Sequence, residues 1–258
     1  MNITILTLFP EVIDAVLGKS IIGRAVDAGI LSIRAVDIRD FAPNRYGKVD
    51  DTLYGGGTGM LMMCQPVYDA WCSVTGGQKK GRTLYMSPKG KVFHQQMAVS
   101  LAKEEELILL CGHYEGIDQR VLDEIVDEEI SIGDYVLTGG EIAACTVVDA
   151  VARLIPGVLP DEDAYRDESH MNYALEHPQY TKPAVWNGRA VPEVLLSGHH
   201  RNIRDWKRIR GLYETLRKRP DLFDRMEIGT SDLEELIRII GEESGLSSTP
   251  AQSHDSHP

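Results

Sequence analysis

The first 160 residues alternate between short apolar runs and amphipathic stretches, and this alternation restricts the fold more than any other feature. The apolar runs have the length and composition of buried strands; they cover residues 3–9, 31–38, 82–86, 107–111 and 129–132. Helical spacing of apolar residues appears in 10–17, 67–74, 93–101, 117–126 and 141–154. Strands that alternate with helices predict an α/β domain with a largely parallel sheet covered on both faces.

Three loops that contain glycine follow predicted strands, at residues 87–90, 112–116 and 133–140. The last belongs to ISIGDYVLTGGE, in which Gly133 and the pair Gly139–Gly140 interrupt an apolar stretch. Such breaks indicate a tight bend or a close approach by a ligand, although a strand, a turn and a helix start would explain them equally well. Because ligands bind beyond the carboxyl ends of parallel strands, the three loops together favour a binding site.

A separate glycine-rich stretch, YGGGTGML, covers residues 54–61. It lacks the Lys-Ser/Thr pair of a P-loop and does not match the GxGxxG dinucleotide pattern. Its glycines indicate unusual backbone dihedrals or a close approach by another group, and the alternative is a plain surface loop.

The chain changes character after residue 160. Residues 161–172 are almost without apolar side chains, and a proline-punctuated segment then leads into a helix-rich stretch. We therefore expect four parts: an α/β domain over 1–160, a flexible linker over 161–173, a helical domain over 174–242 and a disordered tail over 243–258.

The formal net charge of -12 argues against non-specific binding of nucleic acid. The helix-rich stretch is a local exception, because residues 201–219 hold eight Lys or Arg against two acidic residues. Four of the cations share one face at helical spacing: Arg201, Arg204, Lys207 and Arg208. This stripe is typical of phosphate binding, and its alternative is an ordinary solvated helix face.

The remaining composition indicates a cytoplasmic protein. The four cysteines form no CxxC pair and no zinc pattern, and the histidines match no metal-binding motif, so we expect free thiols and no metal. The N-terminus lacks the features of a signal peptide, and no apolar run approaches membrane-spanning length. We expect no membrane association.

Six motifs, in this order, resemble those of one family: LFPE at 8–11, YGGGTGMLM, CGHYEGID at 111–118, SIGDYVLTGGE, IPGVL and VPEVLLSGHH. The chain resembles the TrmD family, the bacterial tRNA (guanine-N(1))-methyltransferases of the SPOUT superfamily, over nearly its whole length to about residue 240. Each motif alone is weak, but their combination is specific.

The resemblance implies a SPOUT methyltransferase domain with a C-terminal trefoil knot, which general topology rules would not predict, and a small helical C-terminal domain. It also implies an obligate homodimer with its sites at the subunit interface. The implied reaction transfers a methyl group from S-adenosylmethionine to nitrogen 1 of guanosine 37 in tRNA. By position, the residues implied to bind this methyl donor are Pro88, Gly112, Tyr114, Glu115, Ile132, Gly133, Asp134, Tyr135, Val136, Leu137, Gly139 and Gly140.

The catalytic residues implied by the resemblance are Arg153 and a carboxylate of the linker. The family uses the aspartate of an Asp-Ser pair as its general base, and here the pair is Glu168–Ser169, with Asp167 as the alternative base. Glu176 is an implied guanine contact and Ser169 an implied substrate-binding residue, and the four-cation stripe becomes a tRNA-backbone contact. We expect residues 169–173 to order only when tRNA and the methyl donor are present.

Two other functions are compatible with these residues. One is an RNA-binding module that binds the methyl donor without catalysis, because glutamate has replaced the usual aspartate. The other is a related SPOUT enzyme that methylates ribose or another base, which the match of the linker and second domain disfavours.

Overall fold

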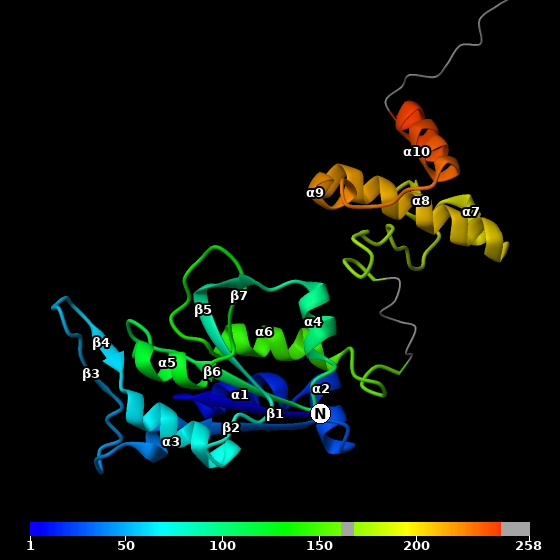
Figure 1. Cartoon of the computed structure of the whole chain (residues 1–258). Coiled ribbons are helices and arrows are strands. Elements are labelled where there is room, and N and C mark those ends of the chain that lie inside the picture. Colours follow the sequence, from blue (N-terminus) through cyan, green and yellow to red (C-terminus); the bar gives the residue numbers. More distant parts are fainter. Residues whose placement is uncertain (161–167, 244–258) are drawn as a thin grey trace, which may run out of the picture. The chain divides into compact units, whose positions relative to one another are not determined.

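The computed structural model describes residues 1–160 and 168–243, the side chain of the last residue excepted, and divides the chain into two compact units, Met1–Glu162 and Asp163–Pro258 (Figure 1). Each unit has its own core of buried apolar side chains. The predictions for residues 161–167 and 244–258 lie outside the described residues.

The first unit is built on a five-stranded sheet in the order β2-β1-β6-β5-β7. The strands are β1 (Asn2–Thr7), β2 (Ser32–Asp37), β5 (Arg82–Val92), β6 (Glu106–Cys111) and β7 (Glu128–Ser131). Every neighbouring pair is parallel. The central strands β1 and β6 are buried along almost their whole length, as expected when helices cover both faces. The predicted parallel α/β sheet is therefore confirmed.

Helices of the first unit pack in two groups (Figure 1). In one, α3 (Cys64–Thr75) contacts α5 (Gln119–Ile125) and the short 3-10 helix η1 (Ile38–Phe41). In the other, α1 (Pro10–Leu17) and α4 (Gln95–Leu101) contact α6 (Glu141–Ala152). The sequence did not predict α2 (Ser20–Asp27), because Gly23 interrupts its apolar pattern. A side chain at Gly23 would lie 2.7 Å from the carbonyl oxygen of Gly18, so close packing of the backbone requires glycine there.

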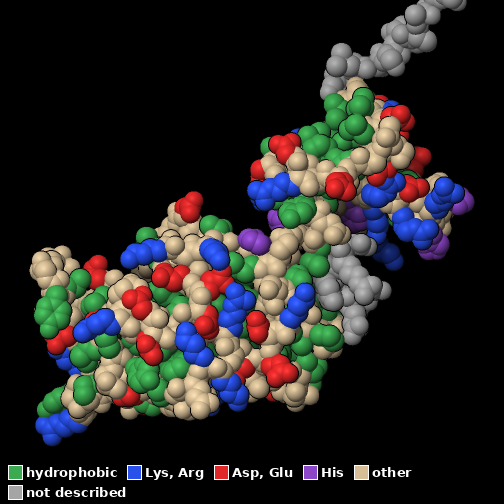
Figure 2. Space-filling view, in the orientation of Figure 1, with side chains coloured by type: hydrophobic (Ala, Val, Ile, Leu, Met, Phe, Trp, Pro, Cys, Tyr) green, Lys and Arg blue, Asp and Glu red, His purple; other side chains and the backbone are tan. Residues whose placement is uncertain are grey.

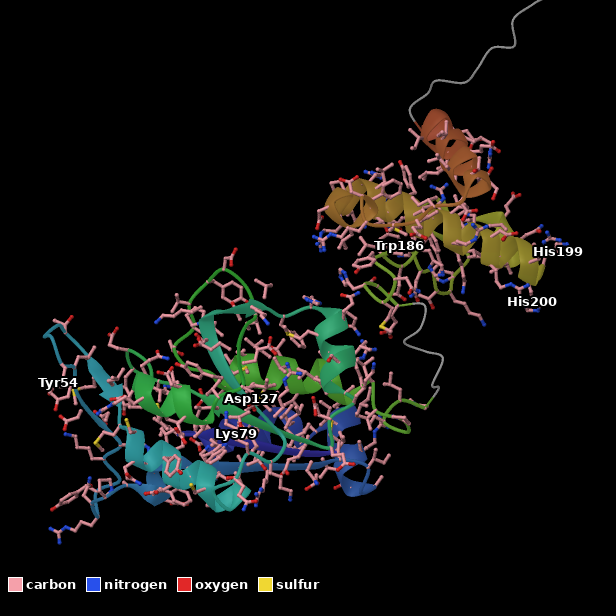
Figure 3. All side chains as sticks on the ribbon, in the orientation of Figure 1. Tyr54, Lys79, Asp127, Trp186, His199 and His200 are labelled. Atoms are coloured by element: carbon pink, nitrogen blue, oxygen red, sulfur yellow. The ribbon has the colours of Figure 1, made fainter. Side chains whose placement is uncertain are left out.

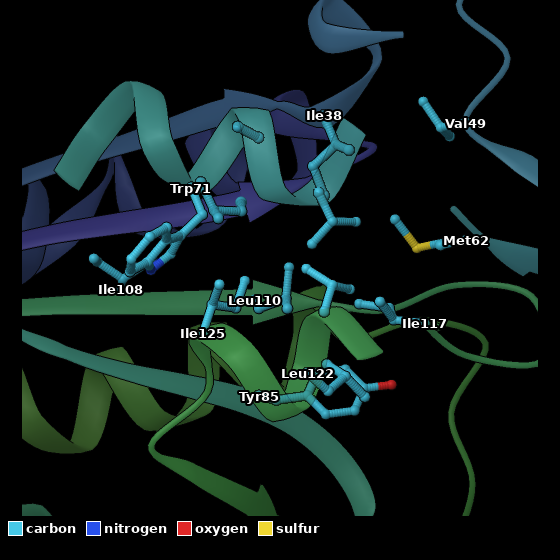
Figure 4. Packing of buried hydrophobic residues seen from close by; sticks show 14 of the residues in the cluster. Ile38, Val49, Met62, Trp71, Tyr85, Ile108, Leu110, Ile117, Leu122 and Ile125 are labelled. Atoms are coloured by element: carbon cyan, nitrogen blue, oxygen red, sulfur yellow. The ribbon is translucent and has the colours of Figure 1, made fainter. Parts of the chain in front are cut away.

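The core between the sheet and the group of α3 and α5 includes Trp71 (Figure 4). Its ring lies among buried side chains that include Ile108 and Ile125. Its indole N–H donates to Thr83 Oγ1 on β5, 3.0 Å away, so the polar atom of this large side chain is satisfied inside the core.

Strand β5 is longer than predicted. The sequence indicated an end at Met86, followed by a loop over residues 87–90, but the strand continues to Val92. Both Met86 and Lys91 pair with Ile130 of β7, so residues 87–90 bulge out of the sheet and the strand then resumes its pairing. The Ser-Pro-Lys-Gly segment is a bulge within a strand and not a loop after it.

The glycine-rich stretch lies in a hairpin of β3 (Asp50–Thr52) and β4 (Met60–Met62), which the sequence did not predict. Tyr54 is 99% exposed in the connecting segment (Figure 3), and the four glycines of this segment have positive φ angles. The base of the hairpin is attached to the loop after β6, because the amide of Glu115 donates to the carbonyl of Met60 and that of Met62 to Gly116. The stretch is therefore an exposed hairpin loop with its base fixed beside one of the three predicted site loops.

The second unit contains the helices α7 (Glu193–Leu196), α8 (His200–Lys218), α9 (Pro220–Phe223) and α10 (Thr230–Glu243), with a small hairpin of β8 (Val185–Trp186) and β9 (Arg189–Ala190). Its core joins Ile209, Leu212 and Tyr213 of α8 to Leu236 and Ile239 of α10. The hairpin turns at Asn187–Gly188, both with positive φ, as in tight two-residue turns.

Within the described residues, no helix combines the length and the apolar character needed to cross a membrane.

Candidate active site

A hollow of about 280 Å³ lies in the first unit where β6 and β7 end and where β5 bulges out of the sheet. Its lining comes from residues 85–89 of β5 and its bulge, from the loop after β6 and from the segment between β7 and α6. These are the three segments that the sequence singled out. Bulging of residues 87–90 brings the first of them to the hollow although the strand does not end there.

The structure gathers most of the residues that the resemblance assigns to the methyl donor around this hollow. Asp134 is the exception, because its side chain is exposed and it does not line the hollow. The other assigned residues all line it: Pro88, Gly112, Tyr114, Glu115, Ile132, Gly133, Tyr135, Val136, Leu137, Gly139 and Gly140.

The character of the lining suits a flat, largely apolar ligand. Ile130, Ile132 and Leu137 supply apolar surface, and Tyr114 and Val136 remain 48% and 83% exposed at the hollow. Large apolar side chains that stay exposed around a hollow are typical of a binding site, because a bound ligand can bury surface that the fold leaves in contact with water.

Other protein groups pack so closely against this lining that a side chain larger than glycine would not fit at Gly139 or Gly140. A Cβ at Gly139 would lie 2.2 Å from His113 Cε1 and 2.6 Å from Glu141 Oε2. A Cβ at Gly140 would lie 2.7 Å from the Cα of Cys111, and Gly133 has a φ of 148°. From the sequence alone, glycines required by close packing of the protein cannot be distinguished from glycines that let a ligand approach. The structure shows that close packing of the protein is the reason at Gly139 and Gly140.

Glu129 and Tyr85 contribute buried polar atoms to the lining. Glu129 Oε2 is buried and has no hydrogen-bond partner in the part of the chain that the structure describes. Burial, and then the charges of Glu129 and Cys111, raises the pKa of Tyr85 to about 12, so this phenol keeps its proton at neutral pH. An unpartnered carboxylate oxygen is satisfied when a hydrogen-bond donor or a cation binds, so the hollow fits a ligand with such groups.

The cysteines near the hollow are not candidate nucleophiles. Burial, followed by the charge of Glu141, raises the pKa of Cys111 well above its usual value and that of Cys145 to about 11. A thiol reacts as its thiolate, so both stay unreactive at neutral pH. All four cysteines of the chain are free.

Arg153 lies far from the hollow along helix α6. It caps the C-terminal end of α6, whereas Gly140 precedes the N-terminal end and lines the hollow. At a rise of 1.5 Å per residue, the helix separates the two positions by about 20 Å. Arg153 is not part of the lining, so a single chain does not bring this predicted catalytic residue to the predicted cofactor residues.

The other predicted catalytic and substrate residues belong to the second unit, where most of those that the structure describes line a hollow of about 760 Å³. Glu168, Glu176, Arg204, Lys207 and Arg208 all line it. Ser169 lies beside them, and its hydroxyl accepts a hydrogen bond of 3.0 Å from the amide of Glu176. Arg201 lies on the first turn of α8, exposed and outside this lining, and Asp167 is outside the described residues.

The cations of α8 differ in their partners. Arg208 forms ion pairs with Asp232 of α10 and, at 3.3 Å, with Asp205. Arg201, Arg204 and Lys207 pair with no carboxylate among the residues that the structure describes. The cations and histidines gathered where α8 begins, near the labelled His199 and His200, are visible in Figures 2 and 3. Arg208 is thus partly neutralised, and the other three are the better candidates for phosphate contacts.

Sequence reasoning missed several groups at these sites. Thr7, His113 and Glu141 are joined by hydrogen bonds beside the first hollow, and His177 and Asp232 line the second. Glu141 needs hydrogen-bond partners in the structure, because its carboxylate is only 5% exposed. That burial could not be read from an acidic residue at a helix start, where glutamate is common on the surface.

Comparison with known proteins gives a consistent result. A family model described as tRNA (Guanine-1)-methyltransferase TrmD matches residues 1–225. A protein of Ruminiclostridium cellulolyticum named tRNA (guanine-N(1)-)-methyltransferase is 57% identical over 227 residues, which cover 88% of this chain and 97% of that protein. Proteins of the same name from Clostridium kluyveri and Clostridium perfringens are each 52% identical, over 239 and 233 residues; these cover 93% and 90% of this chain and 96% and 98% of the relatives.

Proposed function

The chain belongs to the tRNA (guanine-1)-methyltransferase TrmD family, and on that premise we propose that it methylates nitrogen 1 of guanosine 37 in tRNA with S-adenosylmethionine as the donor. The observation that carries the proposal is the hollow formed by the three glycine-containing segments, which gathers the residues that the resemblance assigns to the donor. The cytoplasm, where tRNA is modified, is the proposed location.

The hollow has groups suited to this donor. When bound, S-adenosylmethionine supplies a methyl group already activated on a positively charged sulfur. Ile132 and Leu137 offer apolar surface to an adenine ring, and the backbone of residues 132–140 offers peptide groups for hydrogen bonds. The buried oxygen of Glu129 that lacks a partner among the described residues favours a ligand with positive charge or hydrogen-bond donors.

The proposed chemistry at the acceptor uses a carboxylate and a guanidinium. Nitrogen 1 of guanine carries a proton that must leave as the methyl group arrives, and the carboxylate of Glu168 takes this proton. The guanidinium of Arg153 stabilises the negative charge that develops on the neighbouring carbonyl oxygen. Glu176 and Ser169, which are hydrogen-bonded to each other beside Glu168, hold the guanine edge.

The separation between Arg153 and the hollow supports a homodimer. Because Arg153 lies about 20 Å along α6 from Gly140 in the hollow of its own chain, it reaches a hollow only from a second copy of the chain. Two large apolar side chains, Val16 of α1 and Ile142 of α6, are 55% and 60% exposed on helices that pack together. We propose that this face is buried in the dimer and that each site combines residues of both chains.

The proposed trefoil knot involves the segment between β7 and α6. Strand β7 is at the edge of the sheet, yet α6 packs against β1, β6, α1 and α4. The connecting segment crosses the ends of β5 and β6, where the amide of Gly140 donates to the carbonyl of Gly112 at 3.1 Å. This crossing supports a knot in which the segment passes through the loop that follows β6.

The test of the reaction is transfer of a labelled methyl group to tRNA transcripts that differ only at position 37. We expect transfer to the transcript with guanosine and none to the transcript with adenosine. Transfer to neither transcript, with S-adenosylmethionine bound, would favour a binding module without catalysis. Methylation of ribose or of another base would favour the related SPOUT activity.

The test of the base compares Glu168→Gln with Asp167→Asn. The first variant should lose turnover by about 100-fold or more with little change in affinity for the methyl donor, because a carboxamide does not accept the proton. The second should stay near wild type. Wild-type turnover of Glu168→Gln would exclude Glu168 as the base.

The test of the shared site mixes two inactive variants, Arg153→Ala and Gly140→Val. In a mixed dimer, one hollow is intact and receives the intact Arg153 of the other chain. Random exchange of subunits should therefore restore roughly a quarter of wild-type activity, since half of the dimers are mixed and each has one working site. If Arg153 acts on the hollow of its own chain, mixing restores nothing.

A further inference from the structure

Glu141 is a buried carboxylate that joins three segments of the first unit. It is 5% exposed and begins α6, directly after the Gly139–Gly140 pair. Its Oε1 accepts a hydrogen bond of 2.6 Å from Thr7 Oγ1 at the end of β1. Its Oε2 lies 2.8 Å from His113 Nε2 in the loop after β6, and the imidazole N–H donates when Glu141 is ionised. Both oxygens of the carboxylate are therefore used.

The partners of Glu141 are themselves fixed in place. Thr7 Oγ1 also accepts a 2.9 Å hydrogen bond from the amide of Phe9, so its hydroxyl hydrogen is directed to Glu141. The rings of Phe9 and His113 pack with their centroids 4.9 Å apart. This arrangement leaves little freedom to His113, whose side chain is 16% exposed.

The cluster acts on the hollow through two of its walls. His113, Gly139 and Gly140 line the hollow, whereas Thr7 and Glu141 do not. A Cβ at Gly139 would overlap both His113 and Glu141, so the backbone of the second wall rests directly on the cluster. The amide of Gly140 donates to the carbonyl of Gly112, which ties the same two walls by a second, backbone bond.

We propose that Thr7, Glu141 and His113, here called the Glu141 bridge, form a positioning unit that holds the 112–116 and 133–140 segments at the separation needed by the methyl donor. The identity of the ligand rests on the proposed function. Glu141 is a positioning residue, because it touches the lining and not the hollow. A buried carboxylate with two hydrogen bonds is costly to maintain away from water, and its location between two walls of the hollow accounts for its presence.

The experiment uses three variants of the full chain that remove different numbers of the contacts in the bridge. Glu141→Ala removes every contact, Thr7→Val removes one hydroxyl with little change of shape, and Glu141→Gln keeps the shape and much of the hydrogen bonding. Thr83→Val is the matched control, since it removes the buried hydroxyl that accepts from Trp71 and lies outside the hollow.

The first readout is the dissociation constant of S-adenosylhomocysteine, measured by calorimetry. We expect it to rise by at least about tenfold in Glu141→Ala, because hydrogen bonds to a buried charge are among the strong ones. Thr7→Val should show a smaller rise, Glu141→Gln should recover most of the affinity, and Thr83→Val should bind like wild type. Unchanged affinity in both Glu141→Ala and Thr7→Val would overturn the proposal, as would an equal rise in Thr83→Val.

The second readout is hydrogen exchange of the Gly140 amide in the protein without ligand. The bridge predicts that this amide exchanges about tenfold faster in Thr7→Val and Glu141→Ala, whereas amides of β6 keep their protection. This measurement distinguishes a failure of the proposed function from a failure of the Glu141 bridge. If wild type does not bind S-adenosylhomocysteine, the proposed function fails, and the exchange of Gly140 still decides whether the bridge holds the walls. Equal exchange in wild type and both variants would refute the bridge.

Discussion

Substitution of Gly139 by alanine is the most demanding test of how the wall of the hollow is packed. The added Cβ would lie 2.2 Å from His113 Cε1, whereas ordinary contact begins near 3.4 Å, so the imidazole must move by 3.4 − 2.2 = 1.2 Å or the wall must retreat as far. Glu141 Oε2, 2.6 Å from the same Cβ, blocks the alternative movement.

The cost of this change follows from two contributions. Overpacking of a well-filled region costs about 1–3 kcal/mol, and loss of a hydrogen bond to a charged group costs about 1.5–3 kcal/mol. A conservative total is about 3 kcal/mol, which lowers the melting temperature of a unit of this size by roughly 6–12 °C. Because helix α6 starts immediately after this wall, the change should also weaken binding of the methyl donor by about 100-fold.

The assay is thermal unfolding followed by circular dichroism, together with calorimetric titration of S-adenosylhomocysteine. Gly229→Ala in the second unit is the matched control, because its Cβ would meet no atom within 4 Å and its φ is not in the left-handed region. If Gly139→Ala melts within about 2 °C of the control and binds the ligand equally well, the packing argument is wrong.

Three further outcomes are expected. Hydrogen bonds from Arg120 lower the pKa of Asp118, so Asp118→Asn, which keeps the cap of α5 but loses the ion pair, should cost about 0.5 kcal/mol at pH 7. That difference is present above the unfolded value of 3.8 and should vanish as the pH falls through the lower folded pKa in urea titrations. Lys207→Ala should reduce the slope of tRNA affinity against salt by about one, whereas Lys218→Ala, whose cation is paired with Glu214, should change it less. Peptide mapping should find Cys111 unmodified by iodoacetamide in the native protein at pH 8, because burial raises its thiol pKa.

The sheet could be predicted because each strand carries its own apolar signal. Residues 107–111 are apolar throughout and become the buried strand β6. The end of β5 could not be predicted, since Ser-Pro-Lys-Gly indicates a break and only the pairing of both Met86 and Lys91 with Ile130 returns the chain to the sheet. Local sequence does not contain that long-range register.

The site could be located from sequence but not explained. Loops after three strands indicated a pocket, and the structure brings them together around one hollow. The reason for Gly139 lies in His113 and Glu141, which are distant from each other in sequence and meet only in the fold. The distance of Arg153 from the hollow depends on the direction of α6, which no spacing of motifs provides.

Helix α6 places Gly140 and Arg153 at its two ends, and its length is therefore as constrained as its side chains. If each site takes Gly140 from one chain and Arg153 from the other, the length of α6 fixes the distance between the two sites. Insertion of one residue would advance Arg153 by about 1.5 Å and rotate it by about 100° around the helix axis. Natural variation within this family should thus alter the residues of α6 while leaving their number unchanged.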